Sequence, residues 1–191
     1  AVVVQIGAGL DARYERLGKP RITAWYDLDL PEVIEVRRML LPESDNHYLG
    51  ASMFDEAWMN TVAAHGKPVL LVIEGVLMYF EETQVQDFFK QVARCLPHAQ
   101  LAFDTIPKIY IGQSKRHDAL GKMDKPPEFR WAISGTDDIR RLISGVEIIE
   151  EAGLSSVCKP RYPWLLRLVY ATAWGRCKLD MRLMRIQVPS S

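Results

Sequence analysis

Two glycines near the start of the chain are the first residues whose type and spacing could serve chemistry. Gly7 and Gly9 follow the β-branched run 2–6, which has the character of a strand buried on both faces. A helical stretch begins near Asp11, so the glycines fall at a strand-to-helix turn. Without a Cβ, they let the backbone approach a ligand that the free amides of the next helix would face. The pattern predicts a nucleotide-like cofactor.

Two carboxylates stand about twenty residues further on, at the end of the next apolar run. Asp27 and Asp29 are placed where a carboxylate could accept hydrogen bonds from both hydroxyls of a ribose. Asp29 could equally cap the helix that Pro31 begins. With Ala12, the glycines also fit the G-x-G-x-x-G/A pattern of dinucleotide-binding proteins, so an NAD-dependent oxidoreductase stays open at this point.

A third acidic residue separates the two cofactor classes. Glu74 directly follows the apolar run 69–73 and precedes Gly75, which puts it at the carboxyl end of a central strand. A carboxylate in that position is costly unless it meets a cation or hydrogen-bond donors. A nicotinamide cofactor offers it little, whereas S-adenosylmethionine offers an ammonium and a nearby sulfonium. Glu74 therefore favours S-adenosylmethionine.

The positions of these residues require alternating strands and helices. Short apolar runs alternate with longer amphipathic ones as far as residue 105, which predicts a mostly parallel sheet covered on both sides. The expected strands are 2–6, 22–28, 48–51, 69–73 and 101–104, followed by two late strands, 146–151 and 181–188. The expected helices begin near 11 and 31 and span 57–64, 82–95, 137–143 and 162–174.

Three ordered motifs resemble one family. They are G-A-G-L-D-A-R from Gly7, Y-D-L-D-L-P-E-V-I-E-x-R-R-x-L-L-P from Tyr26, and E-G-V-L-M-Y-F from Glu74. Together they resemble the leucine carboxyl methyltransferase superfamily, and most closely its tetracenomycin-type polyketide O-methyltransferases. The resemblance implies the class I S-adenosylmethionine-dependent methyltransferase fold, a Rossmann-like α/β three-layer sandwich. Its seven-stranded sheet is mostly parallel with an antiparallel last strand. The length of the chain predicts one domain, 1–191, with a cofactor-binding half, 1–105, and a substrate-side half, 106–191.

The same resemblance implies the cofactor-binding residues of this chain. They are Gly7, Gly9, Asp29, Ser52, Met53 and Glu74. Asp29 would bind the ribose and Glu74 the methionine end of the cofactor. Where the family usually has an Asp-Leu pair beside the adenine, this chain has Ser52 and Met53, which predicts a weaker adenine contact unless Asp55 takes that role. Family members also carry a helical segment ahead of the first strand, and without it we expect weak cofactor binding.

Composition excludes several other classes of function. Among 191 residues, 24 Lys+Arg balance 24 Asp+Glu, so no overall field recruits nucleic acid or an anionic membrane. The longest apolar run is far shorter than the ~20 residues of a membrane span. Cys95, Cys158 and Cys177 form neither a zinc motif nor a disulfide framework, so we expect no metal and a cytoplasmic, reducing location. The sequence is compatible with a homo-oligomer.

The catalytic residues are the least determined part of the sequence. A phenol acceptor benefits from a general base, whereas a carboxylate acceptor needs none. Weak candidates are His117, in the polar stretch 108–127, and Tyr79, which could line the pocket; His65 and His98 look like surface residues.

The predicted function is an S-adenosylmethionine-dependent O-methyltransferase that acts on a small molecule, with a polyketide-like hydroxyl or carboxyl as acceptor. One alternative is a carboxyl methyltransferase acting on a protein C-terminus, for which Lys115, Arg116 or Arg130 could hold the carboxylate. Alternatives of another class are the NAD-dependent oxidoreductase and a non-catalytic binding relative.

Overall fold

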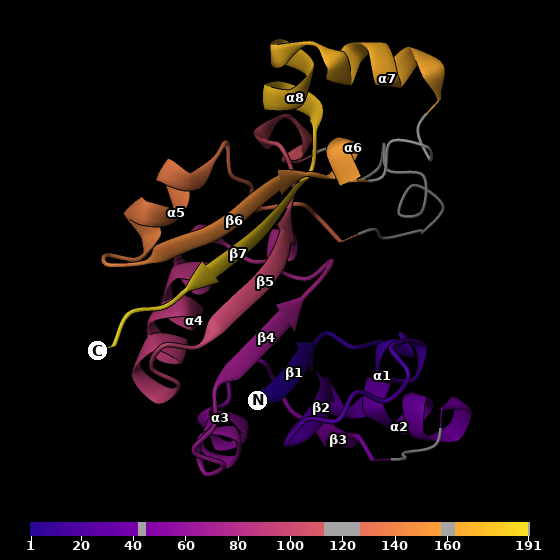
Figure 1. Cartoon of the computed structure of the whole chain (residues 1–191), viewed down its shortest axis with the longest axis vertical. Helices are drawn as coiled ribbons and strands as arrows, with labels where there is room; N and C mark the ends of the chain where they lie inside the picture. The colour runs from indigo at the N-terminus through magenta and orange to yellow at the C-terminus, as the bar shows by residue number, and fades with distance from the viewer. Residues whose placement is uncertain (42–44, 113–126, 158–162, 191) are drawn as a thin grey trace.

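The computed structural model describes residues 1–41, 45–112, 127–157 and 163–190. Strands and helices alternate from the first strand onward (Figure 1). The strands are β1 (Val2–Ile6), β2 (Ala24–Asp29), β3 (His47–Gly50), β4 (Val69–Ile73), β5 (Gln100–Thr105), β6 (Glu147–Gly153) and β7 (Arg182–Gln187). The helices are α1 (Arg13–Arg16), α2 (Pro31–Leu40), α3 (Glu56–Ala63), α4 (Glu82–Cys95), α5 (Thr136–Leu142), α6 (Leu154–Val157), α7 (Trp164–Ala171) and α8 (Ala173–Leu179), with short 3₁₀ turns η1 (Leu77–Tyr79) and η2 (Lys108–Tyr110).

One seven-stranded sheet runs through the molecule in the order β3-β2-β1-β4-β5-β7-β6. The first five strands pair in parallel, and β7 is antiparallel to both of its neighbours. The strand order reverses between β1 and β4, where Ile6 lies opposite Ile73. A reversal of this kind leaves a crevice at the carboxyl ends of the strands, where such folds bind ligands. The predicted fold class is confirmed, including the antiparallel last strand.

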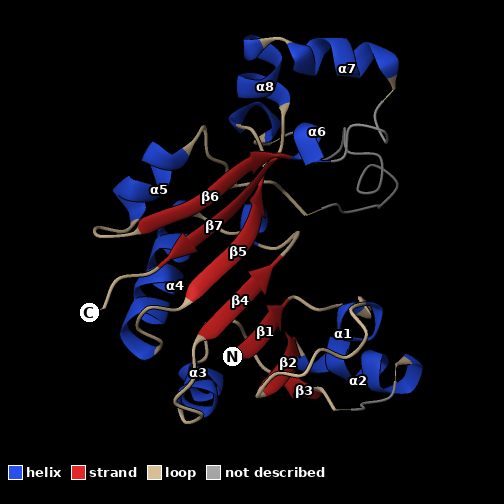
Figure 2. Cartoon of the chain, in the orientation of Figure 1, coloured by secondary structure: helices blue, strands red, loops and turns tan. Residues whose placement is uncertain are grey.

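Helices α3, α4 and α5 cover one face of the sheet and form the main core (Figure 2). Helix α4 contributes the largest share because Val85, Phe88, Phe89 and Val92 lie on one side of it and are all buried. The Phe89 ring packs against Phe103 of β5 at 5.6 Å between centroids. This layer holds β1, β4 and β5 rigidly in register, and so fixes the positions of the loops that follow them.

The opposite face carries the shorter helices α1 and α2. The Tyr14 ring of α1 packs on Trp25 of β2, and these side chains form a small second core with Val3. Helix α1 is only four residues long and begins at Arg13, two residues after Asp11, near which it was expected to begin. On the same face, a hollow of about 410 Å³ lies over β4, β5 and β7, with Val72 and Ala102 among its lining residues.

The C-terminal helical region predicted for 162–174 is two helices, α7 and α8. They lie beyond the carboxyl end of β5, at the top of Figure 1. The chain turns at Thr172, whose Oγ1 accepts a hydrogen bond from the Gly175 amide. Helix α7 exposes Trp164 and Leu168. Within the described ranges, no helix has both the length and the apolar character to cross a membrane.

Candidate functional site

The glycine turn after β1 is built by close packing of its own backbone. Gly7 adopts φ +68°, and a Cβ there would lie 2.3 Å from Cγ2 of Val76. The amides of Gly7 and Ala8 both donate to the Leu28 carbonyl, at 2.8 and 3.1 Å. Gly9 adopts φ +49° with no atom near its Cβ position. The two glycines, both predicted to let a ligand approach the backbone, therefore differ. The missing side chain of Gly7 makes room for Val76, whereas Gly9 borders open space that a ligand could enter.

The glycine turn leads directly into helix α1. This helix is only four residues long, and Asp11 makes no capping hydrogen bond to it. The Asp11 carboxylate instead accepts from Gln5 Nε2 at 3.0 Å and pairs with Arg13 Nη2 at 3.2 Å. Charged side chains that bond to one another therefore surround this turn.

Asp29 closes the turn from the end of β2. Its Oδ2 accepts the Gly9 amide at 2.8 Å and its Oδ1 accepts the Leu30 amide at 2.8 Å. Asp29 therefore fixes the glycine turn, but it does not cap α2 as expected, because the N-cap residue of that helix is Leu30 and no side chain caps it. Each carboxylate oxygen retains a second lone pair, so hydroxyl groups of a ligand can still donate to it.

Asp27, the second acidic candidate, is fully buried and cannot contact a ribose. Its Oδ2 accepts from Arg37 Nη2 at 2.8 Å and from Asn46 Nδ2 at 2.7 Å, and its Oδ1 accepts from Trp25 Nε1 at 2.9 Å. Arg37 is also fully buried, and its Nη1 donates to the Gly9 carbonyl at 2.9 Å. This network supports the turn from beneath, a role that the sequence analysis did not assign to Arg37.

A hollow of about 440 Å³ opens at the strand-order reversal. Its lining brings together residues of all three motifs and of the loop after β3. They are Ile6, Gly7, Leu28, Asp29, Leu30, Ala51, Ser52, Met53, Phe54, Gly75, Val76, Tyr79 and Phe80. The volume falls within the range of small-molecule sites. Four of the predicted cofactor residues, Gly7, Asp29, Ser52 and Met53, thus share one cavity.

The loop after β3 forms the wall where the adenine was predicted. Ser52 Oγ accepts the Phe54 amide at 3.3 Å, and the Met53 side chain is buried against the core. Asp55 is the N-cap residue of α3, and its Oδ2 accepts the Ser52 amide at 3.0 Å. The Asp55 carboxylate is thus engaged by the backbone and is not part of the hollow's lining, which leaves Ser52 as the polar side chain of this wall.

The region after β4 provides the other wall. Tyr79 lines the hollow and stacks on Phe129 at 5.6 Å between ring centroids. Burial raises the pKa of Tyr79, and the nearby Asp104 carboxylate raises it further. Its hydroxyl is therefore neutral at ordinary pH and can donate a hydrogen bond. Glu74 lies at the border of the hollow, beside Gly75, and forms an ion pair with Arg13. His117 lies outside the described residues.

Asp104 is a buried carboxyl at the carboxyl end of β5 that the sequence analysis counted only as a strand residue. Its Oδ1 accepts the Gly75 amide at 2.8 Å and so fixes the backbone beside Glu74. Burial raises the pKa of Asp104; the Gly75 hydrogen bond lowers it and the charge of Glu74 raises it. Its place at the carboxyl end of a buried strand was the available signal.

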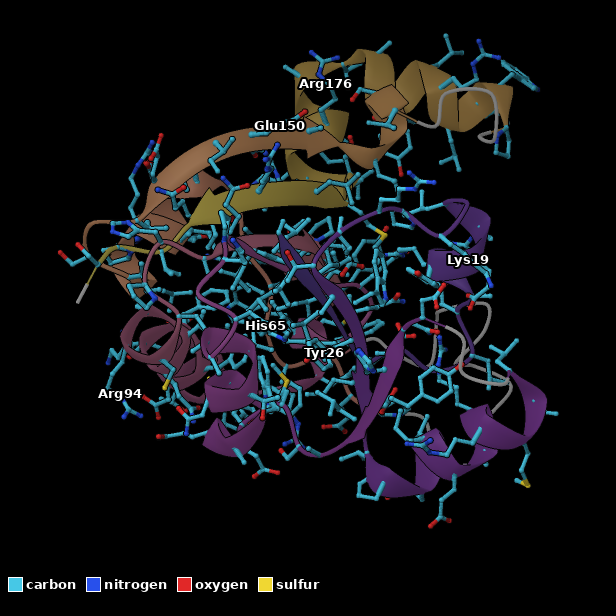
Figure 3. All side chains as sticks on the ribbon, turned by 60° about the horizontal axis from the view of Figure 1, so that its bottom comes forward. Lys19, Tyr26, His65, Arg94, Glu150 and Arg176 are labelled. Carbon is cyan, nitrogen blue, oxygen red and sulfur yellow. The ribbon has the colours of Figure 1, made fainter. Side chains whose placement is uncertain are left out.

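Other titratable residues lie away from this site. His65 is partly exposed, and its Nε2 forms a 2.8 Å hydrogen bond with the Tyr26 hydroxyl (Figure 3). In the part of the chain that the structure describes, His, Cys, Asp and Glu form no group that could hold a metal ion. The 440 Å³ hollow and its charged border are therefore the candidate site.

Comparison with solved structures identifies the class of fold. The chain is similar to an S-adenosylmethionine-dependent methyltransferase from Anabaena variabilis, with a TM-score of 0.64 and 9% identity over 97% of this chain and 76% of that one. It is also similar to an S-adenosylmethionine-dependent methyltransferase from Mesorhizobium loti, with a TM-score of 0.62 and 14% identity over 97% of this chain and 89% of that one. The sheet is that of the Rossmann-like methyltransferases.

Sequence comparison then identifies the family. A family model described as leucine carboxyl methyltransferase matches residues 1–93. The chain is 32% identical over 152 residues to the tetracenomycin polyketide synthesis O-methyltransferase TcmP of Streptomyces glaucescens, covering 79% of this chain and 55% of that protein. Both matches agree with the leucine carboxyl methyltransferase superfamily that the three motifs predict, and the family match spans the residues that carry those motifs. It spans about half the length of the curated relatives it matches.

Proposed function

We propose that the protein is an S-adenosylmethionine-dependent O-methyltransferase that acts on a small molecule with a polyketide-like hydroxyl or carboxyl group. The observation that carries the proposal is the 440 Å³ hollow, in which Gly7, Asp29, Ser52 and Met53 meet at the strand-order reversal. The small-molecule acceptor is supported by the similarity to TcmP, an O-methyltransferase of tetracenomycin polyketide synthesis. The even charge balance supports neither a nucleic acid nor a membrane surface as acceptor.

The residues of the hollow fit an adenosyl group. The Asp29 carboxylate can accept from ribose hydroxyls, and the apolar atoms of Leu30 and Phe80 can pack against a base. Gly9 leaves open space beside Asp29. All the lining residues come from the first 105 residues, which supports the division into a cofactor-binding half, 1–105, and an acceptor-side half, 106–191.

Methyl transfer requires the protein mainly to position the acceptor and to exclude water. When bound, S-adenosylmethionine supplies an electrophilic methyl group on a sulfonium. The rigid strand ends hold the binding residues in place, and alignment of an acceptor with the methyl group lowers the barrier to in-line displacement. Tyr79 remains a candidate at the acceptor side, where its neutral hydroxyl would orient an acceptor oxygen by hydrogen bonding and not remove its proton.

The alternatives have less support. An oxidoreductase would use Asp27, which Arg37 and Asn46 bury completely. For a protein C-terminus as acceptor, Lys115 and Arg116 lie outside the described residues, and Arg130 is paired with Glu81 at 3.3 Å. The cytoplasmic location stays a prediction from the cysteine pattern.

Calorimetric titration with S-adenosylhomocysteine and with NADH tests the proposal. We expect S-adenosylhomocysteine to bind and Asp29→Asn to weaken it about tenfold, because a charged acceptor is replaced by a neutral one. Asp137→Asn, which changes an exposed carboxylate on α5, is the matched control and leaves the affinity unchanged. NADH binding without S-adenosylhomocysteine binding would overturn the proposal. Mass spectrometry of aromatic polyketides incubated with S-adenosylmethionine then distinguishes a methyl ether from a methyl ester, and binding without transfer to any acceptor would favour the non-catalytic relative.

A further inference from the structure

A further hollow lies among the three C-terminal helices α6, α7 and α8, in the upper part of Figure 1. Its volume is about 560 Å³, which falls within the range of small-molecule sites. We call it the α7 hollow, and its lining residues are Ser155, Ser156, Trp164, Arg167, Leu168, Tyr170, Ala171 and Arg176. None of these residues lines the 440 Å³ hollow, so the α7 hollow is a separate place for a ligand.

One face of helix α7 turns toward this hollow. It carries residues at three- and four-residue spacing, Trp164, Arg167, Leu168 and Ala171. Trp164 is 66% exposed and Leu168 is 59% exposed. A helical stripe that carries large apolar side chains normally packs against a core, and an uncovered one marks a surface that binds something. The exposed face of α7 therefore calls for an occupant.

The charges of the lining are positive. Arg176 Nη1 donates to the carbonyls of Tyr170 and Ala171, at 2.9 and 2.7 Å, and is thereby held at the C-terminal end of α7 (Figure 3). Within the described ranges, the guanidinium of Arg167 has neither a hydrogen-bond nor an ion-pair partner. Among the described residues, the lining includes no carboxylate. The hollow is therefore suited to an anion, with Arg167 as the available cation.

Helix α6 forms the opposite wall, and its hydroxyls are already bonded to the protein. Ser155 donates from its amide and its Oγ to the Asp180 carboxylate, at 3.0 and 2.6 Å, and both residues are buried. Ser156 Oγ donates to the Gly153 carbonyl at 2.6 Å. The charge of Asp180 is thus engaged by the wall itself, and it does not compete for Arg167.

We propose that the α7 hollow binds a planar aromatic carboxylate, with its rings against Trp164 and Leu168 and its carboxylate on Arg167. A guanidinium can bind a carboxylate through two parallel hydrogen bonds. An indole ring offers a flat apolar surface on which another aromatic ring can stack. The inference goes beyond the proposed function, because it assigns a ligand class to a hollow that shares no residue with the candidate cofactor site.

A second copy of the chain fits this hollow less well than a small anion does. In a two-fold symmetric dimer, the same patch lies on both subunits and must be complementary to itself. An interface centred here would bring two sets of Arg167 and Arg176 together, without a carboxylate of the described lining to pair with them. An aromatic carboxylate supplies both the negative charge and the apolar surface that the hollow lacks.

Calorimetric titration with 2-naphthoate tests the site. 2-Naphthalenemethanol keeps the rings without the charge, and cyclohexanecarboxylate keeps the charge without the aromatic rings. We expect 2-naphthoate to bind about tenfold more tightly than 2-naphthalenemethanol and about fivefold more tightly than cyclohexanecarboxylate. Arg167→Gln abolishes the first preference, and Trp164→Leu abolishes the second. Both residues are exposed, so the thermal midpoint of each variant stays that of wild type.

Matched controls change the same residue types outside the lining. Arg140→Gln replaces an exposed arginine of α5, and Trp174→Leu replaces a tryptophan of α8 that is 63% exposed. Both variants keep the two preferences. If 2-naphthoate fails to bind wild type, or if its preference over the alcohol survives Arg167→Gln, the proposal is overturned. A wild-type dimer that Trp164→Glu dissociates also overturns it, because a second copy would then cover the stripe.

Competition with the cofactor separates this proposal from the proposed function. Saturating S-adenosylhomocysteine leaves the affinity for 2-naphthoate unchanged if the two hollows are independent. Displacement of one ligand by the other would place 2-naphthoate in the cofactor hollow and overturn the α7 site. Failure of S-adenosylhomocysteine to bind counts against the proposed function alone, because the titrations of the three probes still decide what the α7 hollow binds.

Discussion

Replacement of Arg37 by methionine is the sharpest test of how the glycine turn is supported. Arg37 and Asp27 form an ion pair at 2.8 Å with both side chains completely buried. Arg37 also donates to the Gly9 carbonyl. Methionine fills a similar volume, but it leaves the Asp27 charge buried and the Gly9 carbonyl without this donor. The variant should therefore lose both global stability and the shape of the turn.

The magnitude follows from the network. Removal of one partner of a buried ion pair costs about 3–5 kcal/mol, because the remaining charge is uncompensated. Asn46 and Trp25 still donate to Asp27, which favours the lower end, about 3 kcal/mol. That is a large part of the ~5–15 kcal/mol by which a domain is typically stable. Adding Asp27→Asn removes the uncompensated charge, so the double variant should recover more than half of the loss.

Urea denaturation followed by circular dichroism measures these effects. The matched control is Arg38→Met, an exposed arginine on the same helix that bonds the Tyr48 carbonyl at 3.2 Å; we expect it to cost less than about 1 kcal/mol. The reasoning is refuted if Arg37→Met costs no more than Arg38→Met, or if Asp27→Asn fails to rescue it.

Three further predictions concern the site itself. Gly7→Ala should destabilise the fold by about 2 kcal/mol or more, because of its positive φ and its clash with Val76. Gly9→Ala, which has the positive φ without the clash, should cost about 1 kcal/mol. In the same denaturation assay, Val76→Ala should restore part of the stability that Gly7→Ala loses. Because burial raises the pKa of Asp104 in the folded state, stability falls as pH rises from the unfolded pKa, about 4, through the folded pKa. Thermal midpoints should show Asp104→Asn gaining on wild type as pH rises above about 4, and parallel curves would contradict this. Ser52→Asp should tighten S-adenosylhomocysteine binding about fivefold by accepting from the adenine amino group, with no gain for S-inosylhomocysteine, which lacks that amino group.

Local sequence was sufficient to predict most of the elements. The buried runs 2–6 and 69–73 have the bounds of β1 and β4, because a strand covered on both faces requires an unbroken apolar run. The predicted ends of the late strands, β6 and β7, lie within two residues of the observed ends. The helical region predicted for 162–174 is divided into α7 and α8, because the Thr172 cap between them depends on a local hydrogen bond that periodicity does not register.

The sequence by itself determined the fold class, the family and the residues that gather at the strand ends, since apolar period and motif spacing are properties of the chain. Only the tertiary structure decided what each of them does. It separated Asp27 from Asp29, because burial is set by Arg37 and Asn46, which lie 10 and 19 residues away. It likewise paired Arg13 with Glu74 across 61 residues, since contacts between strand ends depend on how the sheet is ordered and not on sequence spacing.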